Sequence, residues 1–205
     1  MLRAPAAERN KDVILQVLAR FATAGKKVLE IASGTGQHIN YFGEKLPEVC
    51  FQPSEYDARS LHSIVAHIDT FNFPNVRVPL HIDVSKRFDY WAMPIDYGPK
   101  MVDIILNINM IHICSKASII GLFEAADILL NDTTGILLTY GPYSENGVIT
   151  PESNQSFDKS LRSANHEHGL KDISYIEELA NNANLRLTEK IEVPANNFIL
   201  VFSRI

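Results

Sequence analysis

The amino-acid sequence predicts a single α/β domain whose seven-stranded sheet is mostly parallel, has helices on both faces and ends in an antiparallel hairpin. Two observations predict this class. Apolar strand-like segments alternate with helical patterns between residues 28 and 140, as in folds whose parallel strands are joined by right-handed crossovers. Near the C-terminus, two strand-like segments are separated by only residues 194–197, and so short a connection favours an antiparallel pair.

Each element follows from a local pattern. Strands are expected where short apolar runs occur, at residues 28–32, 49–53, 76–80, 101–108, 135–140, 185–193 and 198–203. Helices are expected where apolar residues recur at helical spacing, at residues 9–22, 37–45, 61–68, 117–130 and 172–183. Asp172 is placed to cap the last of these helices. The run after Asp103 is continuously apolar, which predicts a strand buried on both faces, whereas residues 85–99 are expected to be irregular or partly helical.

Composition and charge narrow the class of protein. The chain has 205 residues, 46% of them hydrophobic and 21% charged, which is ordinary for one globular domain. A formal charge of −5 gives no electrostatic footprint for nucleic acid, and no apolar run is long enough to span a bilayer. We therefore expect a cytoplasmic protein with no nucleic-acid or membrane partner, and no pattern specifies an oligomeric state. Cys50 and Cys114 are expected to be buried, reduced thiols inside strand-like segments.

The most informative segment is the turn that follows the first predicted strand. The strand ends near Glu30 and is followed by Ala32, Ser33, Gly34 and Gly36 before the next helix begins. Glycines in such a turn let the backbone N–H groups approach a nucleotide-like cofactor at the helix N-terminus. Glu30 is expected to help fix the turn and to receive a cationic group of the cofactor, although an acid at a strand end can also be purely structural.

Polar side chains follow three further predicted strands. Glu55 lies about 20 residues beyond the glycine turn, where a carboxylate can accept hydrogen bonds from ribose hydroxyls, and Asp57 is a rival for this role. Asp83, followed by Val84, comes after the third strand and is either a base-binding acid or the cap of the next segment. Asn107 comes at the end of the fourth strand. Because the carboxyl ends of parallel strands form the ligand-binding edge of an open sheet, these residues are expected to surround one site.

A histidine follows the fourth strand, and no metal site is predicted. His112 is the one candidate for a general base, although a buried or capping histidine fits the same position. His166 and His168 form the best local cluster of possible ligands, but no third ligand accompanies them.

The acids after successive strands and the antiparallel tail resemble the Rossmann-like class I methyltransferase domain. Most of the chain is similar to the methyltransferase-like protein 26 family, a family of unknown function. The similarity rests on residues 5–11, 28–38, 52–55, 107–112, 140–143, 153–162 and 194–197. It implies S-adenosylmethionine as the cofactor, methyl transfer to an acceptor that the family does not identify, and an alanine in place of the usual glycine at position 32. Residues 107–113 look like the equivalent segment of small-molecule methyltransferases, so a small-molecule acceptor is expected. A non-catalytic cofactor-binding module is the main alternative. A nicotinamide-dependent oxidoreductase is another, but it would need a third glycine that the turn lacks.

The same resemblance draws attention to regions outside the glycine turn. Residues 1–25 are expected to form an N-terminal lid and helix, with Glu8, Arg9 and Asn10 before that helix. Residues 141–171 are expected to form an insertion that shapes the acceptor site. Acceptor-binding candidates are Arg9, Asn10, Tyr140, Asn154, Phe157, Arg162 and Asn197. For residues 154–162, a surface helix with a local ion pair between Asp158 and Arg162 is an equally good interpretation.

Overall fold

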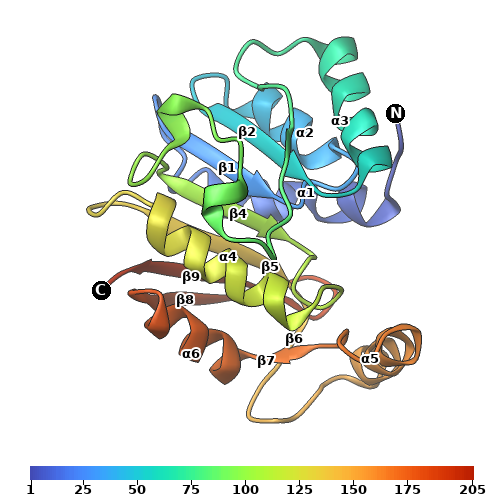
Figure 1. Cartoon of the computed structure of the whole chain (residues 1–205). Helices are drawn as coiled ribbons and strands as arrows, with labels where there is room; N and C mark the ends of the chain where they lie inside the picture. The colour runs from blue at the N-terminus through green and yellow to red at the C-terminus, as the bar shows by residue number, and fades with distance from the viewer.

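The computed structural model describes residues 1–205 and contains one seven-stranded sheet (Figure 1). The strands lie in the order β3-β2-β1-β4-β5-β9-β8. Their bounds are β1 Lys27–Ile31, β2 Cys50–Glu55, β3 Leu80–His81, β4 Ile104–Ile108, β5 Ile136–Gly141, β8 Leu185–Val193 and β9 Asn197–Arg204. The first five in the chain are parallel to one another, and β9 is antiparallel to both β5 and β8. The predicted sheet, including its antiparallel hairpin, is confirmed.

Helices cover both faces of the sheet. One face carries α1 (Pro5–Leu18) and α2 (Gln37–Lys45), with α3 (Ala58–Phe71) packed beside α2, and the other carries α4 (Lys116–Leu129) and α6 (Ile173–Asn182). Side chains cap three of these helices: Asp57, Ser115 and Asp172 each accept a hydrogen bond from a backbone N–H in the first turn. The predicted cap at Asp172 is thereby confirmed.

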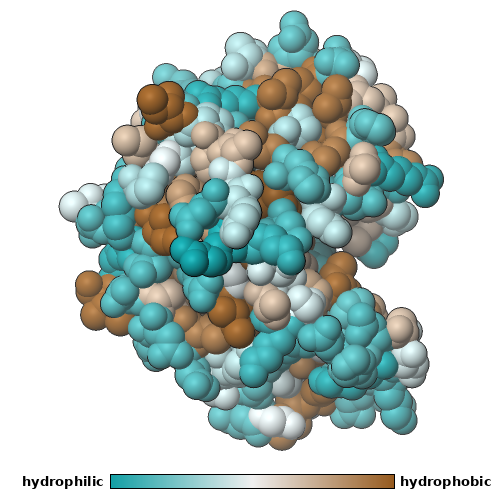
Figure 2. Space-filling model, viewed as in Figure 1, coloured by the Kyte–Doolittle hydropathy of each residue, from teal (hydrophilic) through white to brown (hydrophobic).

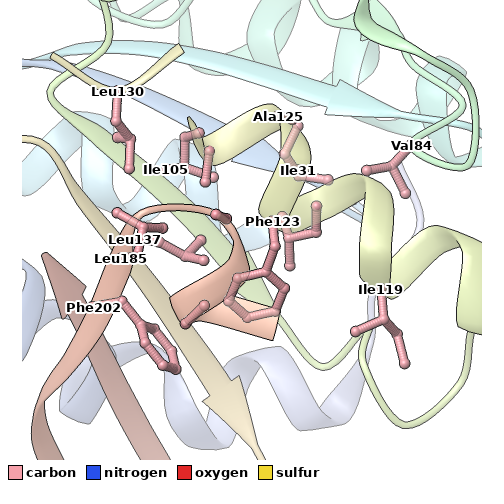
Figure 3. Close-up of a cluster of buried hydrophobic side chains, with 14 of the residues drawn as sticks. Ile31, Val84, Ile105, Ile119, Phe123, Ala125, Leu130, Leu137, Leu185 and Phe202 are labelled. Carbon is pink, nitrogen blue, oxygen red and sulfur yellow. The ribbon is translucent and has the colours of Figure 1, made fainter. Parts of the chain in front are cut away.

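The sheet separates two apolar clusters. Side chains of β4 alternate between them, with Ile104 and Leu106 on the side of α1 and α2, and Ile105 on the side of α4. Figure 3 shows the second cluster, in which Phe123 of α4 meets Phe202 of β9 edge to face, with ring centroids 5.6 Å apart. This arrangement explains why β4 is apolar except for Asn107, because both faces of the strand are buried.

A smaller unit lies beyond β5. It consists of α5 (Glu152–Ala164) and a two-stranded parallel ladder of β6 (Tyr143–Ser144) and β7 (Lys171–Asp172). In Figure 1, α5 stands away from the main sheet at the lower right. The helical spacing of residues 154–162 predicts this helix, but no pattern predicted the short ladder. No helix of the chain is both long and apolar enough to cross a bilayer.

Several expected elements differ from the structure. The third strand is not residues 76–80: it contains only Leu80–His81, and Val76 makes a single bridge to Phe51. Pro79 has no N–H to donate to a ladder, which limits pairing at this edge of the sheet. The fourth strand begins at Ile104 rather than at residue 101. By contrast, residues 85–99 contain two short 3-10 helices, Phe88–Tyr90 and Ile95–Tyr97, in agreement with the expected irregular or partly helical connection.

Candidate functional site

The turn after β1 is tightly constrained by its backbone. Ala32, Gly34 and Gly36 all have positive φ angles, of 60°, 56° and 87°. A Cβ at Gly34 would meet nothing within 4 Å, whereas a Cβ at Gly36 would lie 2.9 Å from the Cα of Ile64. The two glycines therefore serve different purposes: Gly34 leaves space open, and Gly36 permits α2 to pack against α3.

A cavity of about 630 Å³ lies beside this turn, a volume typical of small-molecule sites. It is formed by the carboxyl ends of β1, β2 and β4, by the segment after β3 and by the start of α1. The residues around it include Ala4, Ala7, Glu30, Ala32, Ser33, Gly34, His38, Glu55, Tyr56, Asp83, Val84, Asn109, Ile113, Cys114 and Ser118. Figure 2 shows the surface hollowed at the right, between the part of the molecule that carries α1 and α3 in Figure 1 and the part that carries α5.

Seven of the nine predicted cofactor residues line this cavity: Glu30, Ala32, Ser33, Gly34, Glu55, Asp83 and Val84. Gly36 does not line the cavity; it lies where α2 packs against Ile64 of α3. Asn107 does not line the cavity either. It is fully buried, and its Nδ2 donates to the carbonyl oxygen of Ile31 at 3.0 Å, so it ties the end of β4 to the end of β1.

Glu30 has the most unusual environment in the cavity wall. The residue is 1% exposed, and neither carboxylate oxygen has a hydrogen-bond partner. Burial raises the pKa of Glu30 to about 7, the charge of Glu55 adds to this rise, and the nearby Ser33 hydroxyl offsets part of it. A buried carboxylate without a partner is costly, and a cationic group brought into the cavity would lower that cost.

Glu55 is also buried, at 9% exposed, but its carboxylate accepts several hydrogen bonds. Its Oε2 accepts from the N–H of Gly34 at 2.8 Å, and its Oε1 accepts from the N–H groups of Tyr56 and Asp57 at 2.8 and 3.1 Å. Three backbone donors leave one of the four lone-pair positions for a ligand. The rival, Asp57, does not line the cavity; it caps α3 by accepting from the N–H of Ser60.

Asp83 and Val84 form the opposite wall. The Oδ1 atom of Asp83 accepts from both the N–H and the hydroxyl of Ser85, at 3.0 and 2.6 Å. No helix begins at this point, so Asp83 closes a turn rather than capping a helix. Its second carboxylate oxygen, Oδ2, makes no hydrogen bond within the chain.

The predicted base candidate lies outside the cavity lining. His112 is buried, and burial lowers its pKa to about 4. Its ring meets the ring of Phe157 edge to face at 5.6 Å, and a Cβ at Gly141 would lie 3.4 Å from its Nδ1. His112 thus packs between the end of β5 and α5, and its carbonyl oxygen accepts from the N–H of Gly169 at 2.9 Å.

The acceptor candidates on α1 and β5 lie beside the cavity. Glu8, Arg9 and Asn10 are inside α1 rather than before it, which corrects the sequence expectation. Arg9 is exposed and makes no hydrogen bond or ion pair with the chain, and Asn10 is buried. Burial raises the pKa of Tyr140, and the nearby side chain of Asn10 and the charge of Arg9 partly offset this rise. These side chains therefore form one group.

The N-terminal residues run over the edge of the cavity. The N–H of Leu2 donates to the Ser63 hydroxyl at 2.7 Å, its carbonyl oxygen lies 3.2 Å from Nε2 of His67, and Ala4 bonds to the Gln37 side chain. This segment is therefore held against α2 and α3.

The remaining acceptor candidates lie on or near α5, and the polar ones among them form hydrogen bonds or ion pairs within the chain. Asn154 donates to the carbonyl oxygens of Thr150 and Asn196, both at 3.1 Å. Arg162 forms the expected ion pair with Asp158 at 2.7 Å. Asn197 donates to carbonyl oxygens of its own hairpin turn, and Phe157 is 41% exposed above His112.

Sequence reasoning missed several residues of the cavity wall, among them His38, Tyr56, Asn109, Cys114 and Ser118. Cys114 is in the loop before α4 rather than in a strand, and burial raises its pKa to about 12. His38 had a usable signal, because it follows Gly36 by two residues and so falls in the first turn of α2. The structure contains no group of three or more His, Cys, Asp or Glu side chains arranged for a metal ion.

Several solved structures that resemble this fold are described as methyltransferases. An O-methyltransferase family protein from Burkholderia thailandensis matches with a TM-score of 0.80 and 16% identity, over 97% of this chain and 56% of that protein. Mitomycin 7-O-methyltransferase MmcR matches with a TM-score of 0.77 and 13% identity, over 96% and 54%. A SAM-dependent methyltransferase from Aquifex aeolicus matches with a TM-score of 0.70 and 14% identity, over 98% and 94%.

These likenesses establish the class I methyltransferase fold. The chain spans a little more than half of the first two proteins and nearly all of the Aquifex protein. The family model described as "Protein of unknown function (DUF938)" matches residues 1–204. The chain therefore belongs to the DUF938 family.

Proposed function

We propose that this chain binds S-adenosylmethionine in the cavity beside the glycine turn and transfers its methyl group to a small-molecule acceptor. The observation that carries the proposal is Glu30, a buried carboxylate that lines the cavity without a partner in the chain. S-adenosylmethionine brings an ammonium group as well as a sulfonium, and the ammonium is the kind of group that such a carboxylate requires. The methyltransferase fold and the resemblance to the methyltransferase-like protein 26 group support the same assignment.

The other polar groups of the cavity fit the remaining parts of this cofactor. The free lone-pair position of Glu55 suits a ribose hydroxyl, and the unbonded Oδ2 of Asp83 suits the amino group of adenine. Val84 and Ile113 provide apolar surface for the adenine ring, and the open space at Gly34 admits the methionine portion.

Methyl transfer needs chiefly a well-aligned donor and acceptor. When bound, the cofactor supplies an electrophilic methyl group. The chain holds the reactants in line, excludes water from the buried end of the cavity and removes a proton where the acceptor requires it. The unpaired guanidinium of Arg9, near Tyr140, favours an acceptor that carries a negative charge.

Calorimetric titration with S-adenosylmethionine, S-adenosylhomocysteine and NAD tests the proposal. We expect micromolar binding of the first two ligands and none of NAD. Glu55→Gln should weaken their binding at least tenfold, because an amide replaces one of the two accepting oxygens. Glu48→Gln is a matched control at an exposed glutamate, and it should bind as the wild type does.

Two results would contradict this assignment in different ways. Tight binding of NAD without binding of S-adenosylmethionine would indicate an oxidoreductase. Binding of S-adenosylmethionine without any methylated product, in small-molecule and protein extracts alike, would indicate a non-catalytic cofactor-binding module.

A further inference from the structure

A buried polar chain links three elements at the edge of the cofactor cavity. His38 in the first turn of α2 has its Nε2 atom 2.7 Å from Oδ1 of Asn10 in α1. Tyr140, at the end of β5, lies near Asn10, and the Asn10 side chain offsets part of the rise in the pKa of Tyr140 that burial causes. All three side chains are less than 8% exposed. Of the three, only His38 lines the cavity itself, together with Ala4 and Ala7 of the α1 region and Asn109 after β4.

The bonding of Asn10 fixes the state of the His38 ring. An amide oxygen only accepts hydrogen bonds, so Nε2 of His38 carries the hydrogen and Nδ1 is left with an unshared pair. Stacking of the His38 ring on Phe42, with centroids 5.7 Å apart, holds the ring plane.

His38 lines the cavity, and its Nδ1 atom makes no hydrogen bond within the chain. This atom is not sealed from solvent. Nδ1 of His67 shows the contrast, because that atom is both unpartnered and sealed from solvent. His112 is also a poorer candidate, since its ring lies outside the cavity and packs against Phe157.

We propose that His38 is the general base of the methyl-transfer reaction and that Asn10 is a positioning residue that holds its tautomer. In the step, the acceptor's oxygen or nitrogen forms a bond to the methyl carbon, and the bond between that carbon and the sulfonium sulfur breaks. The electron pair of the broken bond stays on sulfur. The proton of the acceptor passes to Nδ1 of His38 and later to solvent. The acceptor class is therefore a compound whose reacting hydroxyl or amine must lose a proton. This inference rests on the proposed function.

The charge state of His38 is compatible with this role. Burial lowers its pKa to about 4; the Glu8 carboxylate opposes this shift and the Lys11 ammonium reinforces it. Both residues belong to α1, while β5 presents Tyr140 and β1 presents Glu30 in the same region. The imidazole is consequently neutral throughout the physiological pH range, and Nδ1 keeps its unshared pair.

Nitrogen-15 NMR of the imidazole groups tests the assignment without knowledge of the acceptor. In the full chain we expect His38 to be the Nε2–H tautomer and to remain neutral down to about pH 5. Added S-adenosylhomocysteine should shift the Nδ1 resonance of His38 but not the ring resonances of His62, which does not line the cavity. An Nδ1–H tautomer would overturn the proposal, because that nitrogen would then be a donor to the cofactor. An unshifted Nδ1 resonance in the complex would also overturn it, because the ring would not face the ligand.

The variant His38→Gln separates a base from a cofactor-binding residue, and His62→Gln is its control. We expect His38→Gln to bind S-adenosylhomocysteine within threefold of the wild type. Incorporation of tritiated methyl groups from S-adenosylmethionine into a low-molecular-mass cell extract should fall about 100-fold or more. A tenfold loss of binding would make His38 a cofactor ligand instead, and undiminished incorporation would exclude it as the base.

Failure of the proposed function gives a different result. If the wild type binds neither S-adenosylmethionine nor S-adenosylhomocysteine, the proposed function fails whatever tautomer His38 has. If the wild type binds both but transfers no methyl group, cofactor binding stands and the role of His38 as a base is refuted.

Discussion

The cavity beside the glycine turn and the region around α5 both contain polar side chains that the sequence predicts as ligand-binding candidates. The two regions differ in whether these side chains find hydrogen-bond partners within the chain. In the cavity, both oxygens of Glu30 lack partners. On α5, Asp158 accepts from Arg162 and from the N–H of Leu170, both at 2.7 Å, and Asn154 donates twice. A buried group that is unpaired and also lines a cavity indicates a place for a ligand, whereas a group that the chain has paired is sufficiently explained by stability.

Glu30→Gln is expected to have the largest effect on this contrast. The pKa of Glu30 is about 7 in the folded protein, above its ordinary value near 4.5, so the folded state binds more protons between these values. The stability that this group contributes is therefore complete below about pH 4.5 and is lost as pH rises to about 7. The loss is about 3 kcal/mol. Urea unfolding should show that the variant is more stable than the wild type at pH 8 but not at pH 4.5.

The same variant should lose affinity for S-adenosylmethionine while it gains stability. Glu48→Gln, at an exposed position, should change neither property. A Glu30→Gln protein that is less stable than the wild type at pH 8 would show that the carboxylate has a partner in the chain. The assignment of Glu30 to a cationic ligand group would then fail.

The sequence predicts the scaffold of the site better than it predicts which side chains face the cavity. Strands buried on both faces are largely apolar, as in β4, so the sequence predicts where the strands lie. It thereby also predicts that Glu30, Glu55 and Asp83 lie near strand ends. Contacts between side chains that are far apart in the sequence cannot be predicted from such local patterns. His38 and Asn10 are 28 residues apart and meet only because α1 packs against α2.

Similar long-range contacts explain two other differences. Asn107 has the position of a ligand residue at the end of β4, but its amide is used by the carbonyl group of Ile31 on the neighbouring strand, 76 residues away. The ion pair between Asp158 and Arg162 follows from helical spacing, but the second partner of Asp158, the N–H of Leu170, depends on a turn that local sequence does not specify. A contact across the fold thus uses the amide nitrogen of Asn107, while its Oδ1 stays buried and unpaired. A second such contact adds to the local ion pair of Asp158.

Mutations in the α5 region should lower stability and leave cofactor affinity unchanged, in contrast to Glu30→Gln in the cavity. Asp158→Ala is expected to destabilise the protein by about 1–3 kcal/mol, because it leaves the buried N–H of Leu170 without an acceptor. Arg162→Ala removes only the half-exposed partner and should cost about 0.5 kcal/mol. Urea unfolding measures both effects, and calorimetry should find the affinity for S-adenosylmethionine unchanged in each. Weaker cofactor binding by either variant would show that α5 contributes to the cofactor site.

Two alanines in the left-handed region offer the finest comparison, because Ala32 lies in the cavity wall at φ 60° and Ala195 lies in the C-terminal hairpin turn at φ 63°. An L-residue is strained there by about 1–2 kcal/mol, and glycine removes this strain but makes the unfolded chain more flexible. Ala32→Gly and Ala195→Gly should therefore each stabilise the protein by roughly 0.5–1 kcal/mol in urea unfolding. Only Ala32→Gly should also change the affinity for S-adenosylmethionine, by up to about threefold, because only its methyl group borders the cavity. Equal effects of the two variants on affinity would contradict a cofactor contact at the glycine turn.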